Sequence, residues 1–223
     1  MVFKRRSGGQ GVAKDCLYGY HKEKRRRDEV YRYFLFYKPF GCVTARRDER
    51  YPTVMDRFGG PPIPDLSPVG RLDRETEGLL LLTDDGQFNR RMTRPEFHME
   101  KIYDFIVLGD LDDHKRQALE AGVLLTGDPE PTAPARVTVT GKSTLGEIMP
   151  LLHPEIQEKS RHNPMDRTVT FGSITITEGR NRQIRRMMKT QRLLVLALTR
   201  AKMGPYTLPE GMKPGEWTEV ERM

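Results

Sequence analysis

The sequence has few of the residues that stabilise a chain covalently or through a metal ion. It contains two cysteines, Cys16 and Cys42, which have no paired spacing, and its five histidines are scattered along 223 residues. This pattern indicates neither a disulfide framework nor a zinc site. We therefore expect no bound metal.

Long apolar runs are also absent. No stretch approaches the roughly 20 consecutive apolar residues that a membrane-spanning helix requires, and the N-terminus lacks the apolar core of a secretion signal. The N-terminal segment is rich in Arg, as organelle transit peptides are, but it is poor in Ser. We expect no membrane contact and a cytoplasmic location.

Charge is plentiful and unevenly distributed. Charged residues make up 31% of the chain and the isoelectric point is about 9.5. Residues 1–27 contain nine Lys or Arg and two acidic residues, so their net charge of +7 equals that of the whole chain. We assign residues 1–30 to a basic, disordered tail. Such a tail can bind phosphates through counterion release, which adds affinity but no sequence specificity.

The rest of the chain, residues 31–223, has the periodicities of one α+β domain. Residues 141–167 lack a sustained period and contain three prolines, so we predict an irregular insertion there. Strands outnumber helices and do not alternate strictly with them, which favours a mixed, largely antiparallel sheet. Strands are predicted over residues 31–37, 79–82, 102–108, 136–140, 168–177 and 193–198, and helices over 87–92, 112–121 and 181–191.

One charged segment precedes a buried apolar run. Residues 69–79 read VGRLDRETEGL and place Asp73 between Arg71 and Arg74. Neighbouring positive charges favour the ionised form of a carboxyl group, and an ionised carboxylate can act as a nucleophile or base. The residues alone leave two interpretations open, because a loop Asp held in salt bridges fits the same spacing.

A second segment is strongly basic. Residues 178–188 read EGRNRQIRRMM, and six basic residues without an acid lie between Arg180 and Arg192. One interpretation is a solvated basic helix, although such helices usually mix both signs of charge. The other is a helix that contacts phosphates. Its apolar anchors recur at helical spacing, at Ile184, Met187 and Met188.

These two segments resemble signature motifs of the RsuA/RluB/RluE/RluF family of ribosomal RNA pseudouridine synthases, G-R-L-D-x-x-S/T-E-G-L and E-G-R-N-R-Q-I-R-R-M. Three further elements match in order, at residues 38–41 (KPFG), 83–86 (TDDG) and 101–103 (KIY). The similarity extends from about Tyr33 to Val220. It is closest to the RluE-like branch, which lacks an N-terminal RNA-binding module and modifies large-subunit ribosomal RNA.

The resemblance implies a fold, a reaction and three catalytic residues. The fold would have two lobes with a central RNA-binding cleft. The reaction would isomerise a specific uridine to pseudouridine without a cofactor. Asp73 would be the essential carboxylate, Tyr103 would stack on the target base, and Arg185 would pair with Asp73 and hold it ionised. Without the motif, Tyr103 would be taken as an ordinary sheet aromatic.

The resemblance also implies that ribosomal RNA is the partner of a monomeric enzyme. A base inside a stacked helix is inaccessible, so the enzyme must extrude it, and Arg71 is suited to fill the vacated space. The other expected RNA contacts are the cations of the motifs, namely Lys38, Arg74, Arg180, Arg182, Arg186 and Lys189.

The sequence departs from the family pattern at one position, and two alternative functions stay open. Arg192 replaces the glycine that usually ends the basic helix, and we expect this helix to end differently because a non-glycine residue pays for a left-handed cap. The first alternative is a catalytically silent RNA-binding ribosome assembly factor, which would not need Asp73. The second is a metal-dependent hydrolase that uses Asp84 and Asp85, which would need further acidic ligands.

Overall fold

The computed structural model describes residues 31–223. The basic segment 1–30, which we expect to be a disordered tail, lies outside the described residues. No helix within residues 31–223 is long and apolar enough to cross a lipid bilayer.

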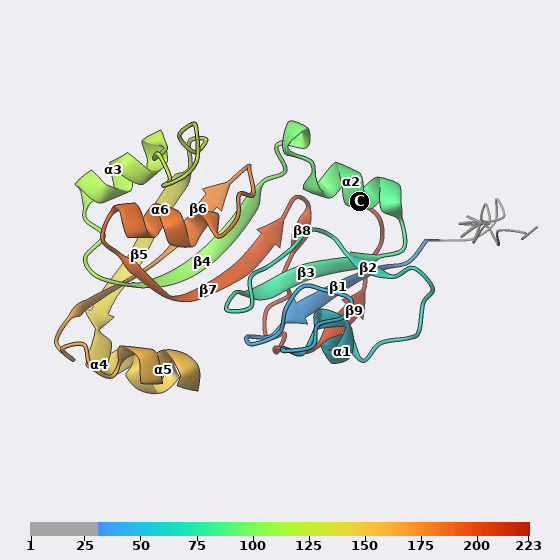
Figure 1. Ribbon diagram of the computed structural model, residues 1–223, viewed down its shortest axis with the longest axis horizontal. Helices are drawn as coiled ribbons and strands as arrows, with labels where there is room; N and C mark the ends of the chain where they lie inside the picture. The colour runs from blue at the N-terminus through green and yellow to red at the C-terminus, as the bar shows by residue number, and fades with distance from the viewer. Residues whose placement is uncertain (1–30) are drawn as a thin grey trace, which may run out of the picture. The chain divides into compact units, whose positions relative to one another are not determined.

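A mixed β-sheet runs through the described part of the chain (Figure 1). Its main strands follow the order β5-β6-β4-β7-β3-β1-β9, while β2 pairs with β3 and β8 with β7. Every pairing between these described strands is antiparallel except that of β3 with β7. The predicted largely antiparallel sheet is therefore confirmed. The strands are β1 (Tyr33–Lys38), β2 (Ser67–Pro68), β3 (Glu77–Thr83), β4 (Lys101–Leu108), β5 (Arg136–Thr144), β6 (Thr168–Ile176), β7 (Leu194–Met203), β8 (Tyr206–Thr207) and β9 (Trp217–Glu219).

A short junction divides the sheet into two antiparallel groups. β5, β6, β4 and β7 form one group, and β3, β1 and β9 form the other. The groups meet where β3 and β7 run parallel, with Glu77 opposite Thr199 and Gly78 opposite Arg200. Gly78 has φ +95°, and a Cβ at this position would lie 2.5 Å from the Arg200 carbonyl oxygen. The close approach of the two groups therefore requires glycine.

Helices cover both faces of the β5-β6-β4-β7 group (Figure 1). On one face lie α3 and α6, and the α6 residues Ile184 and Met187 share a core cluster with Phe105 of β4. On the other face lie α4 and α5, which contribute Leu145 and Ile156 to a separate cluster. The helices of this group are α3 (Asp113–Ala121), α4 (Leu145–Ile148), α5 (Pro154–Ser160) and α6 (Gln183–Thr190).

The second group is also covered on both faces. Leu79 and Leu81 of β3 pack in a cluster with α2 (Gly86–Thr93), whereas Leu80 and Leu82 pack in the cluster that contains α1 (Val54–Phe58). Successive side chains of a strand point to opposite faces, so a strand covered on both sides needs a continuous apolar run. This requirement explains the four consecutive leucines.

The segment 141–167 is not the irregular insertion that its sequence predicts. β5 continues to Thr144, which begins α4 with a capping box to Glu147, and the 3₁₀-helix η2 (Met149–Leu151) and α5 follow. The prediction was wrong because it took the prolines as a sign of irregular structure, whereas two of them occupy the first turns of η2 and α5. A proline is well tolerated there, since the first N–H groups of a helix have no partner within it.

The expected change at the end of α6 is wrong as well. Arg192 adopts the left-handed conformation itself, with φ +59°. The amide of Leu193 donates to the Met188 carbonyl and the amide of Arg192 to the Lys189 carbonyl, both at 3.0 Å. These two bonds define a Schellman motif. The helix thus ends as it would with glycine, and the backbone of Arg192 carries the strain.

Candidate active site

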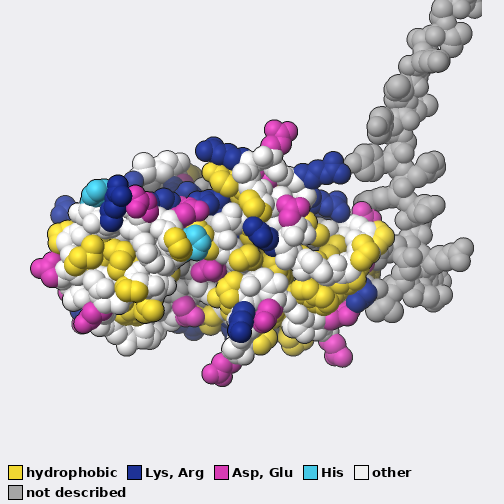
Figure 2. Space-filling view, turned by 90° about the horizontal axis from the view of Figure 1, so that it is seen from below, with side chains coloured by type: hydrophobic (Ala, Val, Ile, Leu, Met, Phe, Trp, Pro, Cys, Tyr) yellow, Lys and Arg dark blue, Asp and Glu magenta, His cyan; other side chains and the backbone are white. Residues whose placement is uncertain are grey.

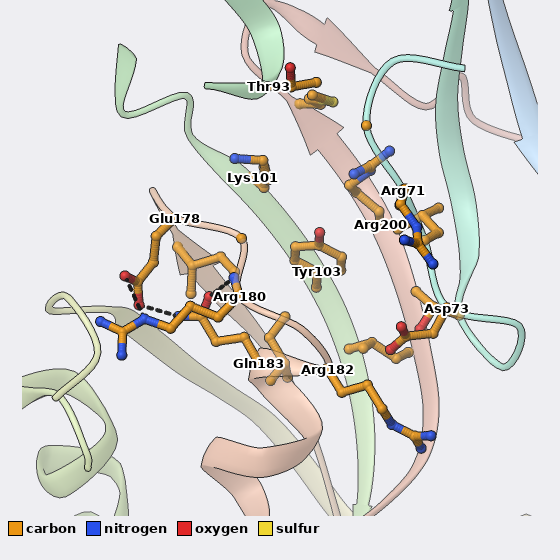
Figure 3. A pocket seen from close by; sticks show the side chains of 18 of the residues that line it. Arg71, Asp73, Thr93, Lys101, Tyr103, Glu178, Arg180, Arg182, Gln183 and Arg200 are labelled. Carbon is orange, nitrogen blue, oxygen red and sulfur yellow. Dashed lines mark hydrogen bonds and ion pairs between the residues drawn. The ribbon is translucent and has the colours of Figure 1, made fainter. Parts of the chain in front are cut away.

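A pocket of about 520 Å³ opens at the junction of the two sheet groups (Figure 3). Its wall comes from the loop after β2, the end of α2, β4, β7 and the segment that links β6 to α6. The charged residues of this wall are seven Lys or Arg and two acids: Arg71, Arg94, Lys101, Arg180, Arg182, Arg185, Arg200, Asp73 and Glu178. The pocket therefore favours an anionic ligand.

Part of the outer surface lacks this bias. Figure 2, which looks onto the molecule from below the view of Figure 1, shows Lys and Arg side chains interspersed with Asp and Glu, with apolar side chains between them. Residues 31–223 also contain no group of three or more His, Cys, Asp or Glu side chains that could hold a metal ion.

The loop that carries Asp73 is held by hydrogen bonds on both sides of this residue. The hydroxyl of Thr44 accepts a bond from the Leu72 amide at 3.0 Å and donates to the Leu72 carbonyl at 2.8 Å. After Asp73, its own carbonyl accepts from the Thr76 amide at 3.0 Å. The backbone at Asp73 is thus fixed without using the carboxylate.

Lys38 holds the same loop and cannot contact RNA, contrary to our prediction. Its side chain is fully buried. The ammonium group donates to the carbonyls of Thr76 at 2.8 Å, Pro39 at 3.1 Å and Arg74 at 3.4 Å. Burial lowers the pKa of Lys38 to about 8. This lysine of the KPFG element is a structural residue.

Tyr103 lies on the floor of the pocket, between the Asp73 loop and the segment from Glu178 to Gln183 (Figure 3). It stands on β4, opposite Ile174 of β6 and Arg200 of β7. Its side chain is largely buried and belongs to the core cluster that contains Ile174 and Ile184. The structure thus brings the predicted residues Asp73 and Tyr103 to one pocket.

Arg185 reaches the pocket too, but its carboxylate partner is not the predicted one. Its guanidinium donates to the Glu75 carbonyl at 2.8 Å and to the Val195 carbonyl at 3.3 Å, and it lies 3.9 Å from the Glu75 carboxylate. Burial lowers the pKa of Arg185, while the charges of Glu75 and Asp73 oppose this shift. The expected direct pair with Asp73 is therefore corrected to a pair with Glu75. The Nε atom of Arg185 is buried and has no partner among the described residues.

Glu75 is the main anion beside the pocket, and its position in the sequence gave no sign of this role. Its carboxylate lies 2.8 Å from the Lys159 ammonium, 3.6 Å from Arg182, and 3.9 Å from both Arg74 and Arg185. Burial opposes its ionisation, but the hydrogen bond from Lys159 and the surrounding charges outweigh burial and lower the pKa of Glu75. One carboxylate thus organises cations from three elements.

Arg74 is not in the pocket wall, although we predicted an RNA contact. It forms two hydrogen bonds with the Glu155 carboxylate of α5, at 3.0 and 2.6 Å. Its guanidinium also lies 4.9 Å from the centre of the Tyr51 ring and 5.7 Å from that of Phe40. Arg74 therefore fastens the Asp73 loop to α5.

The four cations of the basic segment that we predicted to contact RNA fall into two classes. Arg180 and Arg186 share the Asp128 carboxylate and bind backbone carbonyls of residues 126–131, so they hold this loop. Arg180 also lines the pocket. Arg182 and Lys189 are exposed, and of these two Arg182 lines the pocket while Lys189 lies near the far end of α6. Their positions are compatible with RNA contact.

The carboxylate of Glu178 accepts hydrogen bonds from the protein, whereas that of Asp73 accepts none from residues 31–223. The Glu178 carboxylate accepts bonds from the Gln183 amide at 2.5 Å, the Ala133 amide at 3.1 Å and Arg180 at 3.2 Å. The carboxylate of Asp73 makes no hydrogen bond or ion pair with any of residues 31–223. Nor does the exposed guanidinium of Arg71, which lines the same pocket. Asp73 is thus the pocket carboxylate that is available to a ligand.

Comparison with known proteins defines the class of this fold and site. The family described as RNA pseudouridylate synthase matches residues 32–190. The chain belongs to this family and is an RNA pseudouridine synthase. The predicted RsuA/RluB/RluE/RluF resemblance is confirmed.

Individual relatives agree with this assignment. The chain is 33% identical to ribosomal small subunit pseudouridine synthase A of Haemophilus influenzae, over 86% of this chain and 73% of the relative. It is 38% identical to ribosomal large subunit pseudouridine synthase E of Xanthomonas campestris pv. campestris, over 82% of this chain and 92% of the relative. A crystal structure of a pseudouridylate synthase superposes with a TM-score of 0.69 at 33% identity, over 86% of this chain and 71% of the other.

Proposed function

We propose that this protein isomerises a uridine of ribosomal RNA to pseudouridine, with Asp73 as the essential carboxylate. In this reaction the bond between N1 and C1′ breaks and a bond between C5 and C1′ forms, while C5 loses a proton and N1 gains one. The availability of Asp73 carries the proposal. Of the two acids in the pocket wall, Glu178 is held by three donors, whereas Asp73 lies unpaired beside Tyr103.

The pocket supports binding of an extruded nucleotide. Tyr103 offers a ring on which a uracil can stack, as aromatic side chains do for unstacked bases. Arg71 is exposed at the rim and engages no described residue, so its guanidinium is available to occupy the space that the base leaves in the RNA. Arg182 adds a cation for the RNA backbone.

The choice of ribosomal RNA rests on the relatives. Those reported above include enzymes named for the small and for the large subunit. We favour the large subunit because the relative named for it is 38% identical and 92% of its length is covered. We also propose that the enzyme acts as a monomer in the cytoplasm, where its bacterial relatives would meet ribosomal RNA.

The test is to map pseudouridines in both ribosomal RNAs from cells with and without this protein. Purified wild-type protein should then restore the missing pseudouridine, in the large-subunit RNA. Asp73→Asn should lower the rate by about 10⁴-fold and leave RNA affinity nearly unchanged, because the amide keeps the shape of the carboxyl group.

The matched control is Asp113→Asn, which removes an exposed carboxylate of α3 and should keep full activity. Turnover by Asp73→Asn at the wild-type rate would contradict the role of Asp73. A missing pseudouridine in the small-subunit RNA would contradict the choice of subunit, and an unchanged map would contradict the proposed substrate.

A further inference from the structure

Two cations on the pocket floor form no ion pair with a carboxylate of the described residues 31–223. Lys101 donates one hydrogen bond, to the Met99 carbonyl at 2.8 Å. Arg200 is only 2% exposed, and its Nε donates to the Leu79 carbonyl at 2.7 Å. Neither side chain forms an ion pair with an acid of residues 31–223, and the buried Nη2 of Arg200 has no partner there. Buried polar atoms without a partner are rare and need an explanation.

The sheet places these two cations beside Tyr103. Lys101 precedes Tyr103 by two residues on β4, so both side chains point to the same face. Arg200 stands directly opposite Tyr103 on β7, while Ile102 pairs with Lys202, so a bulge leaves Ala201 unpaired between them. All three side chains line the pocket (Figure 3).

The electrostatic interaction between these two cations is unfavourable. Burial and the charge of Arg200 together lower the pKa of Lys101 to about 8. Two cations that share a partly buried site repel each other, and an anion between them would reverse this cost. By contrast, the opposite side of the pocket contains Asp73, which lies beyond Tyr103 as seen from Lys101 in Figure 3.

We propose that Lys101 and Arg200 form a subsite for one backbone phosphate of the substrate RNA, next to the uridine that stacks on Tyr103. The proposal rests on the proposed function for the identity of the ligand as RNA. Two residues along a strand span about 6–7 Å, which is the scale of one nucleotide. Charged donors at two positions suit a phosphate, whose oxygens accept charge-assisted hydrogen bonds. A uracil ring alone would bring no negative charge to this corner.

The first experiment measures binding without turnover, using a nine-residue oligouridylate and fluorescence anisotropy over a range of salt concentrations. Each phosphate contact to a single strand contributes about 0.7 to the slope of log K against log salt. Lys101→Met should therefore lower this slope by about 0.7 and weaken binding about tenfold at low salt. The control Lys142→Met removes an exposed lysine that pairs with Asp110 outside the pocket, and its slope should not change.

An unchanged slope for Lys101→Met overturns the subsite, whether or not the protein forms pseudouridine. Arg200 is buried at the sheet junction, so the test uses Lys101, and thermal unfolding verifies that its variant is folded. A variant with a lower kcat but an unchanged slope and affinity would show that Lys101 acts on the base instead, which also contradicts the proposal.

The second experiment uses a short RNA with the uridine that the mapping identifies. Each phosphate flanking this uridine is replaced in turn by an uncharged methylphosphonate. One replacement should weaken binding to the wild type about tenfold and have no further effect on Lys101→Met. Losses that multiply at every position would contradict a contact between Lys101 and these phosphates, while wild-type turnover on the unmodified RNA would leave the proposed function standing.

Discussion

Lys38, which is buried, and Lys101, which is half-buried, are two lysines of the same sheet with opposite surroundings. Burial lowers the pKa of each to about 8. At the end of β1, Lys38 donates to three backbone carbonyls of the loop around Asp73. At the start of β4, Lys101 donates to one carbonyl and faces the cation Arg200. The ammonium group of Lys38 thus has three hydrogen-bond acceptors within the protein, whereas that of Lys101 has one acceptor and no carboxylate partner among residues 31–223.

This difference separates cations that shape the pocket from cations that await a ligand. Arg74 and Arg185 belong with Lys38, because each is held by carboxylates or carbonyls of the protein. Arg71 belongs with Lys101 and Arg200, because it lines the pocket and has no partner among residues 31–223. Counting basic residues in a sequence mixes these two classes.

The largest expected effect tests the structural side of this comparison. Lys38→Met removes the hydrogen bond to the Thr76 carbonyl and loosens the loop. We expect the free energy of unfolding to fall by about 3 kcal/mol, because buried carbonyls lose their donor. Chemical denaturation measures this change.

Lys101→Met is the matched comparison for Lys38→Met. It removes a partly buried charge that lies beside another cation, so the free energy of unfolding should not fall. If both variants lose the same stability, the distinction between a structural and a ligand-binding lysine is wrong.

The next effect concerns Glu75, the carboxylate that replaces Asp73 as the partner of Arg185. Glu75→Gln keeps the shape of the side chain but leaves Arg185, Arg182 and Lys159 without their anion. Arg185 should then shift toward Asp73, and kcat should fall roughly 10- to 100-fold because the carboxylate is misplaced. The test is single-turnover kinetics. Glu130→Gln, outside the pocket wall, is the control, and equal rates for both variants would contradict a positioning role for Glu75.

The pH dependence of stability gives Glu75 a second readout. Its pKa in the folded protein lies below the ordinary value of 4.5, so the ionised form stabilises the fold. This contribution is fully present above pH 4.5 and is lost as the pH falls through the lowered folded value. The stability difference between wild type and Glu75→Gln should therefore narrow below pH 4.5. A constant difference down to pH 3 would show that the charge of Glu75 does not matter.

The sequence predicted the elements that have a clear local pattern of apolar residues. The continuous run of four leucines after Gly78 lies in β3 as predicted, and the apolar residues of α6 lie at the helical spacing that predicted this helix. The helices α4 and α5 were missed because four and seven residues are too few to show a period. The motifs also led to Asp73 and Tyr103. The ion-pair partners of the charged residues could not be predicted, because they depend on contacts over long sequence distances. Glu75 and Arg185, for example, are 110 positions apart.

The smallest expected effect concerns Arg192 at the end of α6, whose guanidinium forms no ion pair with residues 31–223. Arg192 holds φ +59° in a Schellman motif, a conformation that costs a non-glycine residue about 1–2 kcal/mol. Arg192→Gly should therefore raise the free energy of unfolding by about 1 kcal/mol, or the melting temperature by roughly 2–4 °C. Arg192→Ala keeps the strain and should not stabilise the protein. Because Arg192 is outside the pocket wall, the rate should not change in either variant, and equal stability of the two would place the strain elsewhere.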